Sequence, residues 1–421
     1  MINPRYFYTF FLWLLLPYIF FHLLWRARKQ PEYLQHVAER FGFFSFRNDK
    51  PVIWLHTVSV GETRAAASLV QDLLENFPDH QVLLTHTTPT GRDASKQLYG
   101  DKVLRVYLPY DYPFAVQRFL RHFKPKVGVL LETEIWFNLI HYSHQLHTPL
   151  LLLNARLSEK SAARYSRIPN LCRIGLRQLS AISAQSQEDA NRLQALGAPK
   201  VAIMGNLKYD VDPPSEMLDL GKQFRALLGV NRPIFLAAST RFGEEEILLE
   251  AIKKIDTPNL LSVIVPRHPQ RFDEVSSLLT QHSIRFQRRS ENQPITADTQ
   301  VVLGDSMGEL FAYYVACDIA YIGGSLLPFG GQNLIEACAV GKPVLIGPHT
   351  YNFSEASIQA VEQGAALRIH DVSELASALQ KLLTNTEELA KMSRAGLAFV
   401  ASNKGATEKA LLSIKQHILF K

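Results

Sequence analysis

The sequence predicts an α/β protein with two doubly wound domains and an apolar helix at the N-terminus. Near-continuous apolar runs alternate with helical segments along the chain, which is typical of parallel sheets covered on both faces. The alternation breaks at the paired prolines of Tyr209–Glu216 and then restarts. The chain has 421 residues, which is too long for one ordinary hydrophobic core.

The N-terminal segment Tyr6–Trp25 has twenty residues and contains no Asp, Glu, Lys or Arg. About 20 apolar residues are needed to cross a bilayer, and the basic stretch Arg26–Lys29 favours the cytoplasmic side. We therefore expect residues 1–29 to be a membrane anchor. Pro17 and His22 weaken a straight span, so a helix lying in the interface is an alternative, and a buried amphipathic helix is another.

Strands and helices alternate after this segment. We expect helices at Glu62–Phe77, Gly91–Leu98, Tyr112–Phe123 and Trp136–Gln145, and again from Ser373 to the C-terminus. The apolar runs expected to be strands are 51–60, 81–88, 103–109, 126–134, 149–156, 179–186 and 200–206 in the first half, and 233–240, 260–268, 299–305, 317–324 and 342–348 in the second.

These elements define the expected domains. Residues 30–210 form the first domain, 211–216 the linker and 217–395 the second domain, and residues 396–421 form a helix that packs back on the first. In doubly wound folds ligands bind at the carboxyl ends of the strands. Two such domains facing each other would place a cleft there, so polar residues that directly follow strands are the candidate site residues.

The overall charge of +6 favours an anionic partner, and nucleic acid, anionic lipid and a phosphorylated substrate all fit. The three cysteines have no metal-ligand spacing. No glycine fingerprint follows the first strand, which argues against a dinucleotide oxidoreductase, and there is no Walker lysine motif or H-E-x-x-H. The acidic pair Asp210 and Asp212 lies against the linker prolines, so we interpret it as turn chemistry.

Glu62 is the first candidate, because Gly61 allows a sharp turn from strand to helix and places this carboxylate in the first helical turn. The helix dipole there would lower the pKa of Glu62 and keep it ionised. An ionised carboxylate at a cleft can accept a proton from a hydroxyl nucleophile. The alternative is helix-start electrostatics alone.

Glu132 and Glu134 follow another apolar strand, and like charges two residues apart in a strand would crowd each other if both were buried. We therefore expect at least one of them to meet solvent or a cation. Lys208 lies just before the linker, where it could meet an anionic ligand. The alternatives are a solvated strand end and a surface lysine.

In the second half, Pro266 and Arg267 follow a strand, and Arg267 could bind a phosphate with two hydrogen bonds, unless it is an ordinary surface arginine. The glycine pairs in 323–331 allow close approach of backbone to a ligand, and the following helix start offers N–H groups to a phosphate. Glu336 in that helix could accept hydrogen bonds from ribose. The alternative is that the glycines serve only turns. Residues Met307–Glu309 could line a base or ribose pocket.

Together these motifs resemble those of a known family. The stretches VSVGE, ETEIW, NARLSEKSAARY, GNLKYD, VPRHPQRF, GDSMGEL, GGSLLPFGGQNLIEA and GPHTYNFSEA occur in an order similar to that of the 3-deoxy-D-manno-octulosonic acid (Kdo) transferases. The resemblance extends from the N-terminal apolar segment to about Ala356.

The resemblance implies a GT-B fold, with two Rossmann-like domains around a cleft. It implies an inverting transfer of Kdo from CMP-Kdo to lipid IVA, without metal or other cofactor and without nucleic acid as a partner. The first domain would bind the acceptor and the second the donor. The anchor would hold the protein on the cytoplasmic leaflet of the inner membrane.

The resemblance also implies roles for individual residues. Glu62 matches the proton acceptor, and Glu132 and Lys208 match residues that stabilise the transition state. The residues that match the CMP pocket are Pro266, Arg267, Met307, Gly308, Glu309, Asn333, Leu334, Ile335 and Glu336.

The chain departs from the family pattern at three positions, where it has Phe137, Arg241 and Gln332. Gln332 still offers an amide, and Arg241 keeps a cation near the expected phosphate. Two other functions remain open from the residues: a transferase that uses a nucleotide-diphosphate sugar on a lipid, and a membrane-tethered scaffold that binds nucleotide without turnover.

Overall fold

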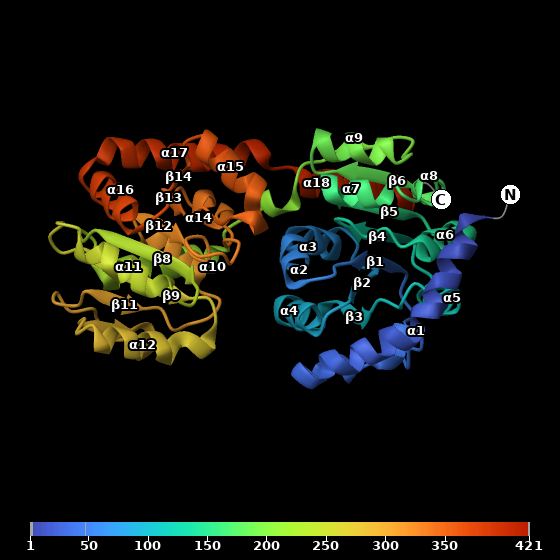
Figure 1. Cartoon of the computed structure of the whole chain (residues 1–421), viewed down its shortest axis with the longest axis horizontal. Helices are drawn as coiled ribbons and strands as arrows, with labels where there is room; N and C mark the ends of the chain where they lie inside the picture. The colour runs from blue at the N-terminus through green and yellow to red at the C-terminus, as the bar shows by residue number, and fades with distance from the viewer. Residues whose placement is uncertain (1–2, 47, 420–421) are drawn as a thin grey trace. The chain divides into compact units, whose positions relative to one another are not determined.

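The computed structural model describes residues 3–46 and 48–419 of the chain, which form two compact units. Unit 1 contains the chain up to Asp210 and the segment from Lys404 onward, and unit 2 is Val211–Asn403. Both units are shown in Figure 1.

Unit 1 is built on a seven-stranded parallel sheet of order β3-β2-β1-β4-β5-β6-β7. The order reverses between β1 and β4, which are paired neighbours. This is the switch point at which doubly wound sheets bind their ligands. The strands are β1 Val52–His56, β2 Gln81–His86, β3 Leu104–Tyr107, β4 Val127–Leu131, β5 Leu150–Ala155, β6 Ala181–Ala184 and β7 Ala202–Ile203.

Both faces of this sheet are buried, because alternate residues of each strand point to opposite sides. In β1, Val52 and Trp54 belong to one hydrophobic cluster, and Ile53 and Leu55 to the other. The α-helices of unit 1 are α1 Pro4–Lys29, α2 Val60–Ala65, α3 Ala67–Asn76, α4 Pro89–Tyr99, α5 Pro113–Phe123, α6 Phe137–Gln145, α7 Glu159–Tyr165, α8 Pro169–Gln178, α9 Gln187–Ala195 and α18 Ala406–Leu419. Short 3₁₀ turns lie at Pro31–Leu34, Val37–Phe41, Gly100–Lys102 and Leu207–Tyr209.

Helix α18 returns to unit 1 and packs on α3, β4 and β5. The Asp210 carboxylate accepts hydrogen bonds from the backbone N–H groups of Gly405 (2.7 Å) and Thr407 at the start of this helix. The Asp210 carboxylate is therefore a cap for a distant helix, while the Asp210 backbone N–H closes the local 3₁₀ turn by donating to the Leu207 carbonyl oxygen at 3.1 Å. The returning segment is shorter than the expected 396–421, because residues 396–403 complete α17 of unit 2.

Unit 2 is a second seven-stranded parallel sheet, of order β10-β11-β9-β8-β12-β13-β14, with a switch point between β8 and β12. The short strands β10 and β14 were not expected from the sequence, because they lie at the sheet edges and lack an apolar run. The strands are β8 Ile234–Thr240, β9 Leu261–Pro266, β10 Phe286–Arg288, β11 Val301–Leu303, β12 Ile319–Ile322, β13 Val344–Ile346 and β14 Ala366–Arg368.

The α-helices of unit 2 are α10 Ser215–Leu228, α11 Glu244–Lys253, α12 Phe272–Gln281, α13 Leu310–Ala316, α14 Ile335–Ala339, α15 Ser354–Glu362, α16 Val372–Thr384 and α17 Thr386–Asn403. Its 3₁₀ turns are Pro269–Arg271, Arg289–Glu291 and Tyr351–Phe353.

The first part of α1 is docked on unit 1 by polar contacts. Arg5 Nη1 donates to Asn138 Oδ1 at 2.9 Å, and the Tyr8 hydroxyl donates to Asp111 Oδ2 at 2.8 Å. Tyr112 donates to a carbonyl oxygen of α1 at 2.7 Å. Figure 1 shows α1 bending partway along its length, and the internal Pro17, which lacks an N–H, is the usual cause of such a kink.

The outer face of α1 is apolar and exposed. Among the described residues α1 is the one helix long and apolar enough to cross a membrane, as judged by its length and composition. Its exposed large side chains are Tyr6, Phe7, Phe10, Phe11, Trp13, Leu14, Leu15, Tyr18, Phe20, Phe21, Leu24 and Trp25.

Candidate active site

Glu62 lies at the start of α2, directly after β1 and beside the switch point of unit 1. Ser59 caps the helix by accepting a hydrogen bond from the Glu62 N–H. The Glu62 carboxylate in turn accepts from the Val58 N–H at 2.8 Å and from the Ser59 hydroxyl at 3.1 Å. These reciprocal bonds resemble a capping box and hold the carboxylate in one orientation.

The pKa of Glu62 is raised to about 7, chiefly because burial removes water from the carboxylate. The hydrogen bond from Val58 opposes this shift, and the negative charges of Glu132 and Glu134 add to it. The expectation of a lowered pKa was therefore wrong in direction. The helix start does supply stabilising hydrogen bonds, but desolvation and two neighbouring carboxylates outweigh them.

Glu132 lies across the switch point from Glu62, just after β4. Its backbone has φ +59°, and β4 ends at Leu131 instead of reaching residue 134. Glu132 and Glu134 therefore do not lie two residues apart on one strand, as the sequence analysis expected. Glu132 Oε1 lies 3.5 Å from Lys208 Nζ. The expectation that at least one of the two carboxylates meets solvent or a cation is confirmed by this ion pair.

Lys208 is positioned by the amide of Asn206, two residues earlier, and by amides from two other segments at the carboxyl edge of the sheet. Asn206 Oδ1 accepts from the Lys208 N–H at 3.0 Å, and Asn206 Nδ2 donates to Gln185 Oε1 at 3.0 Å. Asn154 Oδ1 accepts from the Leu207 N–H at 3.1 Å. These three amides were not among the residues expected from the sequence. Gln185 directly follows β6 and Asn206 follows β7 after two residues, whereas Asn154 lies within β5 itself.

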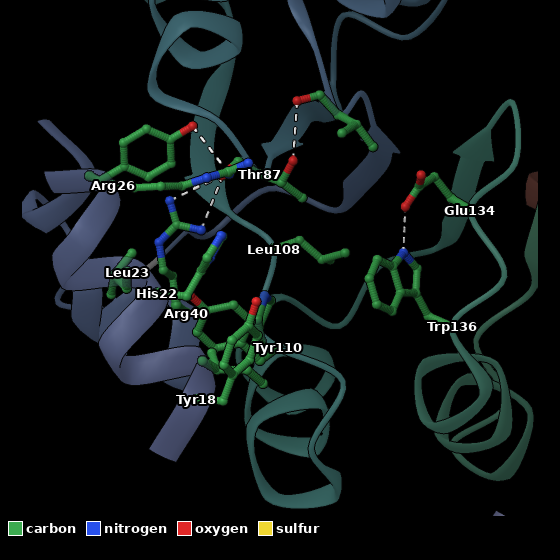
Figure 2. A pocket seen from close by; sticks show the side chains of 14 residues that line it. Tyr18, His22, Leu23, Arg26, Arg40, Thr87, Leu108, Tyr110, Glu134 and Trp136 are labelled. Carbon is green, nitrogen blue, oxygen red and sulfur yellow. Dashed lines mark hydrogen bonds between the residues drawn. The ribbon is translucent and has the colours of Figure 1, made fainter. Parts of the chain in front are cut away.

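Glu134 points to a different set of partners. Its Oε2 accepts a hydrogen bond from Trp136 Nε1 at 2.6 Å, which Figure 2 shows, and lies 3.7 Å from Nε2 of the fully buried His56. The three carboxylates near the switch point thus have separate partners within unit 1.

Unit 2 gathers cationic and amide side chains at its own switch point. Arg267 Nε donates to Gln332 Oε1 at 3.2 Å. Arg241 lies 4.9 Å from the Phe329 ring centroid, and its Nη1 is 3.1 Å from His268 Nε2. Two positions that depart from the family pattern, Arg241 and Gln332, therefore belong to the same group as Arg267.

The glycine-rich loop after β12 is held by a residue that the sequence analysis missed. The fully buried Glu244 carboxylate accepts from the N–H groups of Gly324 (2.6 Å), Ser325 (3.0 Å) and Leu326 (3.1 Å), and from the Tyr321 hydroxyl (2.6 Å). These N–H groups are thus already bonded to protein. An acidic residue directly after the glycine of a strand-to-helix turn was the signal that could have identified Glu244.

The glycines of this loop serve the protein's own backbone. A Cβ on Gly323 would lie 2.3 Å from the Ser239 carbonyl oxygen, and Gly324, Gly330 and Gly331 all have positive φ. The positive φ of Gly324, Gly330 and Gly331 fits the turn interpretation, whereas Gly323 is required by the close approach of the protein's own Ser239 backbone.

Asn333 and Glu336 lie together at the start of α14. Asn333 Nδ2 donates to Glu336 Oε1 at 3.0 Å, and Asn333 Oδ1 accepts from the Ile335 N–H at 3.0 Å. The side chains of Leu334 and Ile335 are buried, so only their backbones could touch a ligand.

The remaining candidates lie at two other strand ends. Pro266 is the buried last residue of β9. Met307 is exposed, Gly308 has φ +84°, and Glu309 Oε1 lies 3.2 Å from Arg289 Nη2. In the part of the chain that the structure describes, no group of three His, Cys, Asp or Glu side chains could hold a metal ion.

Two family models match the chain. Residues 35–211 match the family described as 3-deoxy-D-manno-octulosonic-acid transferase (kdotransferase), and residues 230–399 match glycosyl transferases group 1. These two matches fall on the two units of the structure.

The chain is also similar to curated proteins over its full length. It is 39% identical to 3-deoxy-D-manno-octulosonic acid transferase of Haemophilus influenzae, covering 98% of this chain and 99% of that protein. It is 40% identical to the protein of the same name from Bordetella pertussis, covering 96% and 97%.

Solved structures agree in fold. A glycosyltransferase from Rickettsia africae aligns with a TM-score of 0.57 at 15% identity, covering 89% of this chain and all of that one. HepE from Anabaena, in complex with UDP and glucose, aligns with a TM-score of 0.52 at 17% identity, covering 88% and 98%. Together with the family models, these alignments confirm the predicted GT-B fold of two Rossmann-like units.

Proposed function

The chain belongs to the family of Kdo transferases and is a glycosyltransferase, and from that premise we propose that it transfers Kdo from CMP-Kdo to lipid IVA with inversion. Unit 1 binds the acceptor and unit 2 the donor. The observation that carries the proposal is the Glu62 carboxylate, held at the switch point of unit 1 with a pKa of about 7.

Glu62 is the general base in this proposal. A base with a pKa near the working pH combines a useful ionised fraction with a real driving force for proton transfer. The acceptor hydroxyl oxygen attacks the anomeric carbon of Kdo, and its proton passes to Glu62. The bond from that carbon to the phosphate oxygen breaks, and CMP leaves with the bonding electrons.

Lys208 acts on the charge that develops in this step. Its ammonium group lies 3.5 Å from Glu132, which orients it, and the amides of Asn154 and Asn206 fix the turn that carries it. A preorganised cation stabilises developing negative charge without having to reorganise during the reaction.

The donor phosphate is bound by Arg267 and Arg241 in the proposal, with Gln332 as their amide neighbour. Arginine suits this role because its planar guanidinium matches phosphate with two parallel hydrogen bonds. Pro266, Met307, Gly308, Glu309 and the backbone and polar side chains of Asn333–Glu336 complete the CMP site. Glu336 and Glu309 are the acceptors for nucleoside hydroxyls or amines.

The membrane attachment is part of the same proposal. Trp13 packs on Tyr112 with ring centroids 5.1 Å apart, so α1 is docked on unit 1 at this residue, and Leu23 and Ala27 near the end of α1 are buried as well. Twelve residues lie between Trp13 and Arg26, which makes about 18 Å of helix, less than the ~30 Å hydrocarbon core. We therefore propose that α1 lies in the interface on the cytoplasmic side of the inner membrane, with its apolar face in the lipid.

Glu62→Gln tests the proposal, because it keeps the shape of the side chain and removes the base. We expect the transfer rate to fall by about 10²- to 10⁴-fold, while CMP binding measured by calorimetry is unchanged. The matched control is Glu75→Gln, at a residue that is exposed at the far end of the adjacent helix α3.

A donor screen runs beside this variant. Use of a nucleotide-diphosphate sugar in place of CMP-Kdo, or CMP binding without any product from lipid IVA, would contradict the proposed reaction. Full activity of Glu62→Gln would remove Glu62 from the mechanism but leave the reaction in place.

A further inference from the structure

A cavity of about 320 Å³ lies between the second part of α1 and the carboxyl edge of the unit 1 sheet. Tyr18, His22 and Arg26 of α1 form one wall. The opposite wall comes from the segments after β1 to β4, with Val58, Thr87, Leu108, Tyr110, Glu134 and Trp136 among its residues. This volume is at the lower end of the range for ligand pockets, about 300–1,000 Å³.

The cavity has a cationic end and an acidic end. Figure 2 shows Tyr18, His22, Arg26 and Arg40 together on one side, with Glu134 and Trp136 on the other. Leu108 lies between these two groups in the same view. The two ends of the cavity thus carry opposite charge, with the apolar Leu108 between them.

Arg40 at the cationic end is almost fully buried. Both of its Nη atoms donate to the Thr87 carbonyl oxygen at 3.1 Å, and its guanidinium lies 3.9 Å from the Tyr107 ring centroid. Its neighbour Glu39 pairs instead with Arg92 at 2.7 Å. Within the described residues Nε of Arg40 has no hydrogen-bond partner, and no ion pair involves Arg40.

A buried cation without a carboxylate partner is costly unless an anion is supplied. Arg26 lies beside Arg40 in the cavity, with its Nη1 3.4 Å from the Tyr33 hydroxyl, and the described ion pairs include none for Arg26 either. Two arginines facing one cavity suit a phosphate group.

The acidic end connects to the proposed catalytic base. Val58 lines the cavity, and its N–H donates to Glu62 Oε2 at 2.8 Å. Glu134 also lines the cavity, and its charge contributes to the raised pKa of Glu62. A ligand with its phosphate at the arginines therefore extends toward Glu62.

We propose that α1 is a wall of the acceptor site: the cavity binds the phosphorylated, acylated sugar of the acceptor, with Arg26 and Arg40 on a phosphate. Tyr18, Ile19 and Leu23 lie along the side where an acyl chain passes to the lipid. The proposal rests on the proposed function and deepens it, because α1 then selects the substrate as well as attaching the protein to the membrane.

Arg26→Ala is the test, and Arg28→Ala is the matched control. Arg28 is exposed on the same last turns of α1 and does not line the cavity. Turnover is measured in detergent micelles with lipid IVA and with lipid IVA from which the phosphates have been removed. Donor-free binding of both acceptors is measured alongside.

We expect Arg26→Ala to raise the KM for lipid IVA and weaken its binding by about 10- to 100-fold. In Arg26→Ala the KM for CMP-Kdo stays within about twofold of the wild type. The KM and the dissociation constant for the dephosphorylated acceptor also stay within about twofold. Arg28→Ala behaves like the wild type with both acceptors. Binding of the two variants to anionic vesicles falls equally, by about the amount that one basic residue contributes.

Equal effects of Arg26→Ala and Arg28→Ala in micelles would overturn the proposal, since the arginine would then act only in membrane attachment. The proposal would also be overturned if Arg26→Ala weakened binding of the dephosphorylated acceptor as much as it weakens binding of lipid IVA. A wild-type protein that makes no product from CMP-Kdo contradicts the proposed function instead, and donor-free binding of lipid IVA then still decides whether the cavity holds a phosphate.

Discussion

The Glu62 carboxylate caps its own helix and also has a pKa suited to a base. Its hydrogen bonds from Val58 and Ser59 orient it, while burial and the charges of Glu132 and Glu134 raise its pKa to about 7. The capping interpretation and the catalytic interpretation are therefore compatible at this residue.

The pH dependence of turnover follows from this shift. A base must be deprotonated to act, so we expect kcat/KM to fall about tenfold per pH unit below a pH of about 7 and to level off above it. The rate profile of the purified enzyme with saturating donor checks this. If kcat/KM fell only below about pH 4.5, the ordinary pKa range of a glutamate, this would contradict a pKa of Glu62 that is raised by desolvation.

The same pKa shift makes the stability of the folded protein fall with rising pH, whereas turnover rises with pH. Because the pKa of Glu62 in the folded protein lies above its ordinary value, the folded state binds the proton more strongly, and this contribution is lost as the pH rises from about 4.5 to about 7. We expect Glu62→Gln to gain stability relative to the wild type between pH 5 and pH 8, measured by urea unfolding. Asp111, whose pKa is also raised to about 7 by burial, is common to both proteins and cancels in the comparison.

Glu244 is the residue on which the loop after β12 depends. In Glu244→Gln an NH₂ group would replace one of the two carboxylate oxygens. This group cannot accept hydrogen bonds, so the backbone N–H groups that donate to that oxygen would lose their buried partner. We expect a loss of about 2–4 kcal/mol in the free energy of unfolding and weaker CMP binding. Glu246→Gln, at an exposed position on the same helix, should change stability by no more than about 0.5 kcal/mol.

At the scale of the element, α18 is the part of the chain that completes unit 1 from its far end. Ala406, Ala410 and Ile414 of this helix are buried in the cluster that covers one face of the sheet. Asp210, which caps this helix, is the last residue before unit 2 in the sequence, whereas the helix begins after unit 2. Unit 1 therefore folds around two segments that are far apart in the chain.

Ile414→Ala tests this arrangement. Ile414 is fully buried, so we expect a loss of about 2–5 kcal/mol in the stability of unit 1. Leu412→Ala removes a side chain that is 52% exposed on the same helix and should have little effect. Similar urea midpoints for the two variants would show that α18 does not contribute to the core.

At the scale of the whole molecule, one helix connects the proposed chemistry to the proposed membrane attachment. The inner face of α1 contacts unit 1 and the cavity, and its outer face is apolar. Since our proposals give both roles to the same helix, attachment and acceptor binding are expected to be coupled in this protein.

The outer face gives a separate prediction. Phe7, Phe11 and Phe21 are 55%, 60% and 68% exposed, so replacing all three with serine should leave unit 1 folded. We expect each replacement to weaken vesicle binding by roughly 1.5 kcal/mol, which is about tenfold. Co-sedimentation with anionic vesicles measures this, and Phe242→Ser, at a 73% exposed residue of unit 2, is the control. Undiminished binding of the triple variant would place the membrane contact elsewhere.

The sequence alone was sufficient for the fold and for the positions of most candidates. Parallel strands buried on both faces must be apolar runs, so most of the strands could be recognised one at a time, whereas β10 and β14 at the edges could not. Glu62, Glu132 and Arg267 could be identified because a doubly wound topology brings the residues after its strands to one edge.

Only the tertiary structure decided what these residues meet. The raised pKa of Glu62, the Glu244 hydrogen bonds to the loop after β12 and the Arg40 cavity beneath α1 all depend on groups distant in the sequence. Desolvation and hydrogen-bond pairing are set by which atoms surround a side chain in space. The local pattern that places a residue at a strand end or helix start does not contain that information.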